Sequence, residues 1–192
     1  PQSASRKRRL TRLWLRKRTL CIAKIIEPIG NNDYKPSVAR WNMATEEINP
    51  MPYEYPDLKK VRFIYAASAE HQLYVQCYTQ YDLMTICDFN GNLKCNIYGP
   101  KWVNEKTQTQ HYSLGVEFCG DKILALYSGG DHRTDAYYPT KFLVFDLNGN
   151  YLKTLETGYM ITDFCYDKEN NRLIINLNDE IQFTYLDLEG II

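Results

Sequence analysis

The densest group of chemically capable side chains lies in residues 128–139, which read Ser-Gly-Gly-Asp-His-Arg-Thr-Asp-Ala-Tyr-Tyr-Pro. This segment offers carboxylates and an imidazole, which are groups that ligate metals, and two adjacent tyrosine rings, which could stack on a sugar or another ring. A further histidine at the start of a predicted strand would complete a pocket with this segment. The candidate ligand-binding residues are therefore His111, Asp131, His132, Asp135, Tyr137 and Tyr138.

The alternative interpretation is that residues 128–139 form an ordinary long connection whose polar side chains are solvated. An Asp-x-x-x-Asp pair with one histidine has too few ligands to specify a metal site, so no metal is predicted. The sequence also lacks a G-x-S-x-G elbow, a G-x-G-x-x-G loop, a phosphate-binding loop and an H-E-x-x-H motif. We therefore predict no catalytic residue and no cofactor.

The six cysteines contain no C-x-x-C pair, which is the spacing typical of zinc sites. Most of them lie inside apolar, strand-like runs, where a cysteine behaves as a small buried hydrophobe. Cys87 and Cys95 flank one predicted hairpin turn and could form a disulfide only if the strand register brings them together. We expect free thiols.

The formal net charge of zero conceals an uneven distribution. Residues 1–20 hold eight of the 23 basic residues and no acidic one, so the remainder of the chain is acidic. We predict that residues 1–20 are a basic, disordered N-terminal extension, although such an arm could also touch an anionic membrane or nucleic acid. An acidic domain lacks the basic surface that binds phosphate groups, so nucleic acid is not an expected partner.

No apolar stretch is long enough to span a membrane, and the arginines among the first apolar residues leave no secretory signal. The protein is then either cytoplasmic or lacks its native N-terminus and signal in this sequence.

The most informative signal is internal repetition. Residues 86–94 read Ile-Cys-Asp-Phe-Asn-Gly-Asn-Leu-Lys, and residues 144–153 read Val-Phe-Asp-Leu-Asn-Gly-Asn-Tyr-Leu-Lys. A degraded copy, Tyr-Leu-Asp-Leu-Glu-Gly, occupies residues 185–190, and a fainter one lies at residues 39–45. Asn-Gly between apolar alternations is a strong hairpin signal, because tight turns that match the strand twist need positive φ. Each copy predicts a strand, a tight turn and a return strand.

Two more strands precede each of the last three marked hairpins, which gives four antiparallel strands about every 40–50 residues, the blade unit of a β-propeller. We predict an all-β fold with β-propeller-type repeats of four-stranded antiparallel blades that form an incomplete ring. The domain spans residues 21–192 and holds about three to four blades. The predicted strands cover residues 21–27, 37–42, 61–67, 72–79, 83–88, 93–97, 112–119, 122–127, 141–146, 151–156, 161–166, 172–177 and 181–187.

Residues 138–150 and 161–167, which carry the blade motif and its following strand, resemble the TolB-like six-bladed β-propeller proteins of Bacteroidota. The similarity covers roughly residues 35–192. It implies a propeller that corresponds to the C-terminal part of a six-bladed ring. Many members of this family are lipoproteins of unassigned function, which implies a place in the periplasm or at the cell surface.

Repeated blades without a catalytic constellation favour a non-enzymatic binding or scaffold module, with a protein or glycan ligand held by loops on one face of the ring. The alternative is a propeller enzyme, a hydrolase or lyase acting on a glycan or other extracellular substrate. In that case residues 128–139 should line a concave pocket together with His111.

An incomplete ring leaves blade faces and a strand edge uncovered. Three outcomes follow: a small closed ring in which residues 21–27 supply the last blade's missing strand, an open fragment that pairs with another chain, or poor solubility. We favour the second, as a homodimer or as one half of a propeller whose missing half lies elsewhere.

Overall fold

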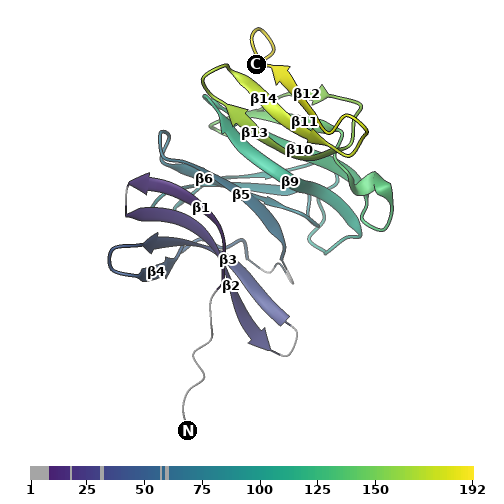
Figure 1. Cartoon of the computed structure of the whole chain (residues 1–192). Coiled ribbons are helices and arrows are strands. Elements are labelled where there is room, and N and C mark those ends of the chain that lie inside the picture. The colour runs from purple at the N-terminus through teal and green to yellow at the C-terminus, as the bar shows by residue number, and fades with distance from the viewer. Residues whose placement is uncertain (1–8, 18, 31–32, 57, 59–60) are drawn as a thin grey trace.

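The computed structural model describes residues 9–17, 19–30, 33–56, 58 and 61–192, and nearly all of them lie in antiparallel sheets or the turns between them (Figure 1). The first sheet contains β1 (Arg9–Lys17), β2 (Leu20–Gly30), β3 (Asp33–Asn42) and β4 (Glu47–Pro50). The second contains β5 (Phe63–Ser68), β6 (Leu73–Tyr78), β7 (Leu83–Asp88) and β8 (Leu93–Tyr98).

The third sheet contains β9 (Thr109–Cys119), β10 (Lys122–Asp131), β11 (Lys141–Asp146) and β12 (Tyr151–Glu156), with the short 3-10 helix η1 (Asp135–Tyr137) between β10 and β11. The fourth contains β13 (Ile161–Asp167), β14 (Arg172–Leu177) and β15 (Phe183–Asp187). Each strand pairs with the next one along the chain, so every sheet is a simple meander. The predicted propeller-type, all-β fold is confirmed.

The repeated turn has the same chemistry in all four sheets. In each copy a side-chain oxygen of the first turn residue accepts a hydrogen bond of 2.8–3.0 Å from the backbone N–H two residues later. These first residues are Asn42, Asp88, Asp146 and Asp187. In the third sheet the side chain and backbone of Asn150 also donate to the Asp146 carboxylate, and these bonds lower the pKa of Asp146. The positions that the sequence aligned are therefore structurally equivalent.

Alternate side chains of each inner sheet point to opposite neighbours, as the two-residue period of a strand requires. On β10, Ile123 and Ala125 pack against the second sheet, whereas Leu124 and Leu126 pack against the fourth. All four of these side chains are fully buried. The core is thus divided into three layers, each enclosed between two consecutive sheets.

The turn of one sheet also rests on the sheet before it. Gly149, at φ 87°, lies against the second sheet, where a Cβ atom at this position would come within 2.8 Å of both Cys95 Sγ and Ile97. Only glycine meets both demands, the positive φ and the close approach. The β11–β12 turn therefore fixes the spacing between the second and third sheets.

The sheets follow one another in chain order, from the purple N-terminal sheet to the yellow C-terminal one (Figure 1). The first strands of successive sheets lie next to each other, and an ion pair of 2.7 Å between Lys168 and Glu70 joins the first turns of the fourth and second sheets. Among the described residues no buried cluster joins the first sheet to the fourth. The expectation of an unclosed array agrees with this arrangement.

The possibility that residues 21–27 close the ring is wrong. They belong to β2, which pairs with β1 on one side and with β3 on the other, so both of its edges are occupied. A strand with two partners has no backbone groups left to complete the fourth sheet. The fourth sheet keeps three strands, with β15 at its edge.

The N-terminal segment also differs from the expected disordered extension. Residues 9–17 form β1, because the N–H and C=O groups of β2 would otherwise lack partners along one edge. Residues 1–8 and 18 lie outside the described part of the chain. Strand β4 was not predicted either, since its four residues are mostly exposed, end at Pro50 and show no apolar alternation.

The register between β7 and β8 places Cys95 opposite Ile86, and Cys87 opposite Leu93. Cys87 and Cys95 are therefore not cross-strand partners, and all six cysteines are free. In the part of the chain that the structure describes, no helix has the length and apolar character needed to cross a membrane.

The division of the core into layers predicts the effect of truncating a single ring. Phe142 is fully buried and meets Phe164 edge to face, with the ring centroids 4.9 Å apart, across the layer between the third and fourth sheets. Phe142→Ala should lower the free energy of unfolding by about 3–5 kcal/mol in urea denaturation. The matched control Tyr159→Ala, at a ring that is 56% exposed, should change it by less than about 0.5 kcal/mol.

Candidate functional site

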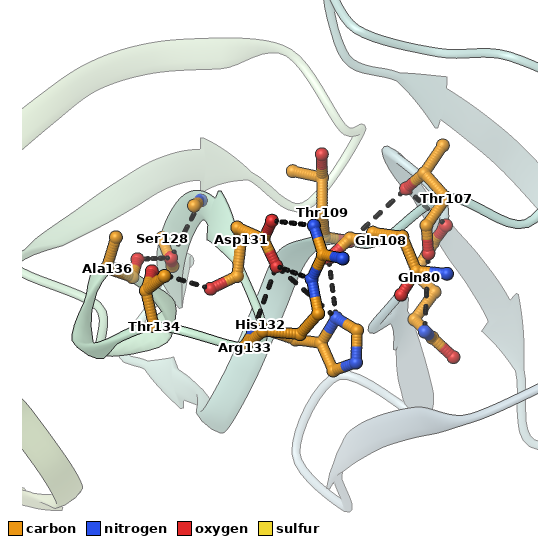
Figure 2. Close-up of polar contacts among 11 residues, drawn as sticks. Gln80, Thr107, Gln108, Thr109, Ser128, Asp131, His132, Arg133, Thr134 and Ala136 are labelled. Atoms are coloured by element: carbon orange, nitrogen blue, oxygen red, sulfur yellow. Dashed lines mark hydrogen bonds and ion pairs between the residues drawn. The ribbon is translucent and has the colours of Figure 1, made fainter.

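The candidate residues other than His111 lie at one end of the third sheet, where β9 and β10 extend beyond the rest of the sheet. The β9–β10 ladder continues through the pairs Gly130–Gln110 and Asp131–Thr109, so residues 128–131 are strand rather than loop. The chain then folds back through η1, and Ser128 Oγ donates a 2.6 Å hydrogen bond to the carbonyl oxygen of Ala136. The predicted loop is thus a braced extension of a hairpin (Figure 2).

Asp131 and His132 are held by their neighbours in this extension. The Asp131 carboxylate accepts hydrogen bonds from Nε and Nη2 of Arg133, over 3.0 and 2.6 Å, and from the Arg133 backbone N–H (Figure 2). This contact holds the pKa of Asp131 well below its usual range. His132 Nδ1 donates to the carbonyl oxygen of Gln108 over 2.9 Å. Both side chains therefore serve to fix the hairpin.

Beyond them, Asp135 begins η1, whose N-cap Thr134 makes no capping side-chain hydrogen bond, and the carbonyl oxygen of Asp135 accepts the N–H of Tyr138. The rings of Tyr137 and Tyr138 stack on each other with centroids 4.2 Å apart. Each ring thus already covers one face of the other. Within the described residues no three histidine, cysteine, aspartate or glutamate side chains gather closely enough to hold a metal ion.

His111 lies apart from these side chains, in the interior between the second and third sheets, where it is 1% exposed. Its Nδ1 atom is 3.3 Å from the hydroxyl of Tyr127, and the Tyr127 hydroxyl donates to Oδ2 of Asp82 over 3.3 Å. Because the single hydroxyl hydrogen goes to Asp82, Nδ1 of His111 carries the proton and donates to Tyr127. Burial lowers the pKa of His111, against the opposing effect of the Asp82 carboxylate 3.7 Å away, so the imidazole is neutral.

Asp82 is the residue that sequence reasoning missed. It is 1% exposed and lies in the turn between β6 and β7, where its Oδ2 atom also accepts the backbone N–H of Lys101 over 2.9 Å. Its carboxylate lies directly on Gly99, at which a Cβ atom would come within 2.2 Å of the carboxyl group. The only sequence signal was an acidic residue immediately before an apolar strand. Tyr127, which is 45 residues away in the chain, gave no signal of its own.

A group of aromatic rings lies on the second sheet's side of this end. The ring of Trp102 has its centroid 5.7 Å from that of Tyr55 and 5.1 Å from that of Tyr98, and Tyr98 is 49% exposed. The structure therefore shows two kinds of group at this end: braced polar side chains on the β9–β10 extension, and a packed set of rings in which Tyr98 is exposed and the other two are half-buried. The six predicted residues do not converge on one point, since His111 is buried and the others lie at the surface.

Comparison with solved structures places the fold in a known class. The chain is similar to a member of the DUF4221 family from Bacteroides vulgatus, with 13% identity, a TM-score of 0.57 and coverage of 91% of this chain and 63% of that one. It is also similar to BamB from Moraxella catarrhalis, a β-propeller, with 13% identity, a TM-score of 0.52 and coverage of 90% and 42%.

A protein of unknown function from Bacteroides caccae shows 16% identity and a TM-score of 0.50, with coverage of 79% of this chain and 50% of that one. The fold is thus of the β-propeller type, and this chain spans 42–63% of the length of these three structures. No family model matches the chain. No curated protein matches it either.

The buried histidine predicts a pH dependence of stability. Because the pKa of His111 is lower in the folded than in the unfolded state, the unfolded chain binds the extra proton first as the pH falls. The stability that His111 contributes should be complete above about pH 6.5 and should decrease below it. Urea midpoints measured between pH 7.5 and pH 5 should show this loss, and His111→Gln should flatten the curve in that interval. An unchanged slope in the variant would contradict the neutral, buried state of this imidazole.

Proposed function

We propose that this chain is a non-enzymatic β-propeller binding module. The observation that carries the proposal is the engagement of the candidate polar groups in bonds to their own neighbours. Asp131 is held by Arg133, His132 by a backbone carbonyl and His111 by Tyr127. A general acid, base or nucleophile must be free to reach a substrate. Asp131 and His132 instead stiffen the surface that carries them, and His111 is buried.

The exposed ring of Tyr98 supplies contact area, and two half-buried rings support it. Tyr98 and its neighbours Tyr55 and Trp102 pack edge to face or tilted, so that their orientation is fixed before any partner arrives. Rigid aromatic side chains lose little conformational entropy on binding and are enriched at the energetic centres of interfaces. The loops that carry these rings therefore form our proposed binding surface.

The alternative, a hydrolase or lyase acting on a glycan or other extracellular substrate, has weaker support. It needs His111 and the residues of the β10–β11 connection to line one concave pocket. His111 is 1% exposed, whereas the Asp131 side chain is 36% exposed and bonded to Arg133.

We further propose that the chain corresponds to the C-terminal part of a TolB-like propeller of Bacteroidota, with a lipoprotein's place in the periplasm or at the cell surface. The support is the blade repeat, the partial coverage of longer propellers and the two similar Bacteroides structures.

Activity measurements test the binding function directly. The full chain, assayed on chromogenic esters, phosphates and glycosides and on peptide substrates, should show no turnover above a buffer blank. Asp131→Asn and His132→Gln should give the same result as the unmodified chain. Turnover that disappears in either variant would refute the binding-module proposal and support the enzyme alternative.

The outer face of the fourth sheet is a candidate surface for association with another protein chain. Its inner face is buried through Phe164, Leu173 and Ile175, whereas Phe183 and Tyr185 on β15 are 68% and 63% exposed. The register places Tyr185 beside Ile174 on the same face, and β15 pairs only with β14. An apolar face beside an unpaired edge favours association. We propose that a second copy of the chain covers it, as a homodimer.

Light scattering at several concentrations should show the molar mass of a dimer. We expect the interface of this dimer to exceed about 1,000 Å². The double variant Phe183→Glu and Tyr185→Glu should be monomeric, since two carboxylates would then be buried without partners. Val103→Glu changes another exposed apolar residue, 47% exposed, in the loop between the second and third sheets, and should remain dimeric. A monomer at all concentrations for the unmodified chain would exclude the dimer.

A further inference from the structure

A cavity of about 220 Å³ lies between the first and second sheets. Strand β3 contributes one wall, β5 and β6 contribute the facing wall, and described residues of the β4–β5 connection line the rest. The lining is rich in aromatic rings, which are Tyr34, Tyr53, Tyr55, Phe63 and Tyr78. The volume is below the roughly 300–1,000 Å³ of sites for drug-sized molecules, so the cavity has room for a small ligand of one or two rings.

The buried end of the cavity holds a side-chain amide without a partner. On β6, Gln76 lies between Tyr74 and Tyr78 and shares their face of the strand, which packs toward the first sheet. Gln76 is 6% exposed, and β6 is paired with β5 on one side and β7 on the other. Its backbone is therefore enclosed, and the remaining exposure belongs to the side chain.

The Gln76 amide takes part in none of the side-chain hydrogen bonds of the described residues. An amide carries an NH2 donor and a C=O acceptor side by side. Leaving both of them buried and unpaired costs free energy. This position therefore favours a ligand that brings an acceptor and a donor on one edge.

The polar neighbours of Gln76 are already engaged with one another. The register places Gln76, Thr85 and Asn96 in one row across β6, β7 and β8. The Thr85 hydroxyl donates to the Asn96 side chain over 2.8 Å, and the Asn96 amide donates to the hydroxyl of Tyr53 over 2.9 Å. Because the Tyr53 oxygen accepts in this bond, its own hydrogen is available to a ligand. The cavity thus offers a further donor in addition to the amide.

The charges along the lining favour an uncharged ligand. Lys35 and Glu54 form an ion pair of 2.6 Å, and their side chains are 51% and 47% exposed, so this pair lies at the opening and neutralises itself. The remaining lining carboxylate, that of Asp33, would repel an anion. The buried lining side chains carry no charge, and burial raises the pKa of Tyr78, so its hydroxyl is neutral as well. A buried cation would therefore lose its hydration without gaining a carboxylate.

The aromatic walls favour a flat ring. The rings of Phe63 and Tyr78 are tilted against each other with centroids 6.1 Å apart, and both side chains are 3% exposed. Rings packed in this way keep their orientation, and an aromatic ligand can meet them edge to face or offset.

We infer that this cavity binds an uncharged nitrogen heterocycle of one or two rings whose edge carries a hydrogen-bond donor beside an acceptor, the class that includes nucleobases and nicotinamide. The Gln76 amide pairs with that edge through two hydrogen bonds, and Phe63 and Tyr78 pack against the ring. The inference rests on the proposed binding function and specifies its ligand class, since Tyr55 belongs both to the proposed binding surface and to the lining of the cavity.

The test uses the full chain in calorimetric titrations with adenine, cytosine, uracil and nicotinamide. At least one should bind. Toluene supplies a neutral ring without such an edge, nicotinate an anion and trimethylphenylammonium a cation. Each of these three should bind at least about tenfold more weakly than the best of the four, since an amide that forms two hydrogen bonds discriminates by at least this factor.

The variant Gln76→Met removes both hydrogen bonds from a side chain of similar length, and should weaken the binding at least about tenfold. Gln182→Met makes the same change at an exposed position just before β15, and should leave the affinity unchanged. Because the Gln76 amide has no partner in the ligand-free chain, Gln76→Met should leave the urea midpoint unchanged or raise it. A lowered midpoint would mean that the protein itself holds this amide, and would overturn the site.

Three other results would also refute the inference: no binding by any of the four heterocycles, binding that Gln76→Met does not alter, or equal binding of toluene, nicotinate or trimethylphenylammonium. These results are independent of the turnover assays. A chain without affinity for the heterocycles and without turnover keeps its function as a binding module, whereas turnover removes that function.

Discussion

Each inner sheet of this protein depends on having both of its faces covered by other sheets. The strand period sends Ile123 to one neighbour and Leu124 to the other, and both are fully buried. At roughly 25 cal/mol per Å² of apolar surface, burial on two faces supplies most of the energy that holds such a sheet. An isolated blade would bury neither face, so the stable unit is a set of consecutive sheets. The outermost sheets are the places where this condition is only half met.

The same packing explains the buried polar network around Asp82. A space between two sheets is dry, and a polar side chain placed there must find partners or lose free energy. Asp82 finds two of them at its Oδ2 atom, and Tyr127 keeps its proton because burial raises its pKa. Gly99 provides the room for this carboxylate. The network thus depends on three segments that meet only when the second and third sheets pack together, which is why it lies at their junction rather than within either sheet.

The repeat could be predicted from the sequence because its chemistry is local. The hydrogen bond that Asp146 accepts from the backbone N–H two residues later needs no other part of the chain. The motif that forms it, Asp-Leu-Asn-Gly, occupies four consecutive residues. Strands with clear alternation were predicted for the same reason. Strand β4 was missed because its pairing with β3 is decided by tertiary structure. Strand β1 was taken for part of an extension because residues 1–20 are rich in basic side chains and show no apolar alternation.

The candidate site was predicted less well. The sequence directed attention to residues 128–139 because they are rich in polar groups, but those groups bond to one another and to the backbone. His111 was selected as a ligand-binding candidate beside the start of a predicted strand, but its partners Asp82 and Tyr127 lie 29 and 16 positions away and carry no motif. Chemistry that arises from contacts between sheets leaves little trace in any single segment.

The turn glycine of the third sheet has a consequence for the history of such chains. Because Gly149 lies on Cys95 and Ile97 of the sheet before it, and Gly91 lies on Pro52 just after β4, these two copies carry their own means of docking to their predecessors. A duplicated segment of one blade length would bring both the turn and the surface that receives a turn. Elongation by tandem duplication then needs no new interface, and the number of blades can change while the junction between any two of them is inherited intact.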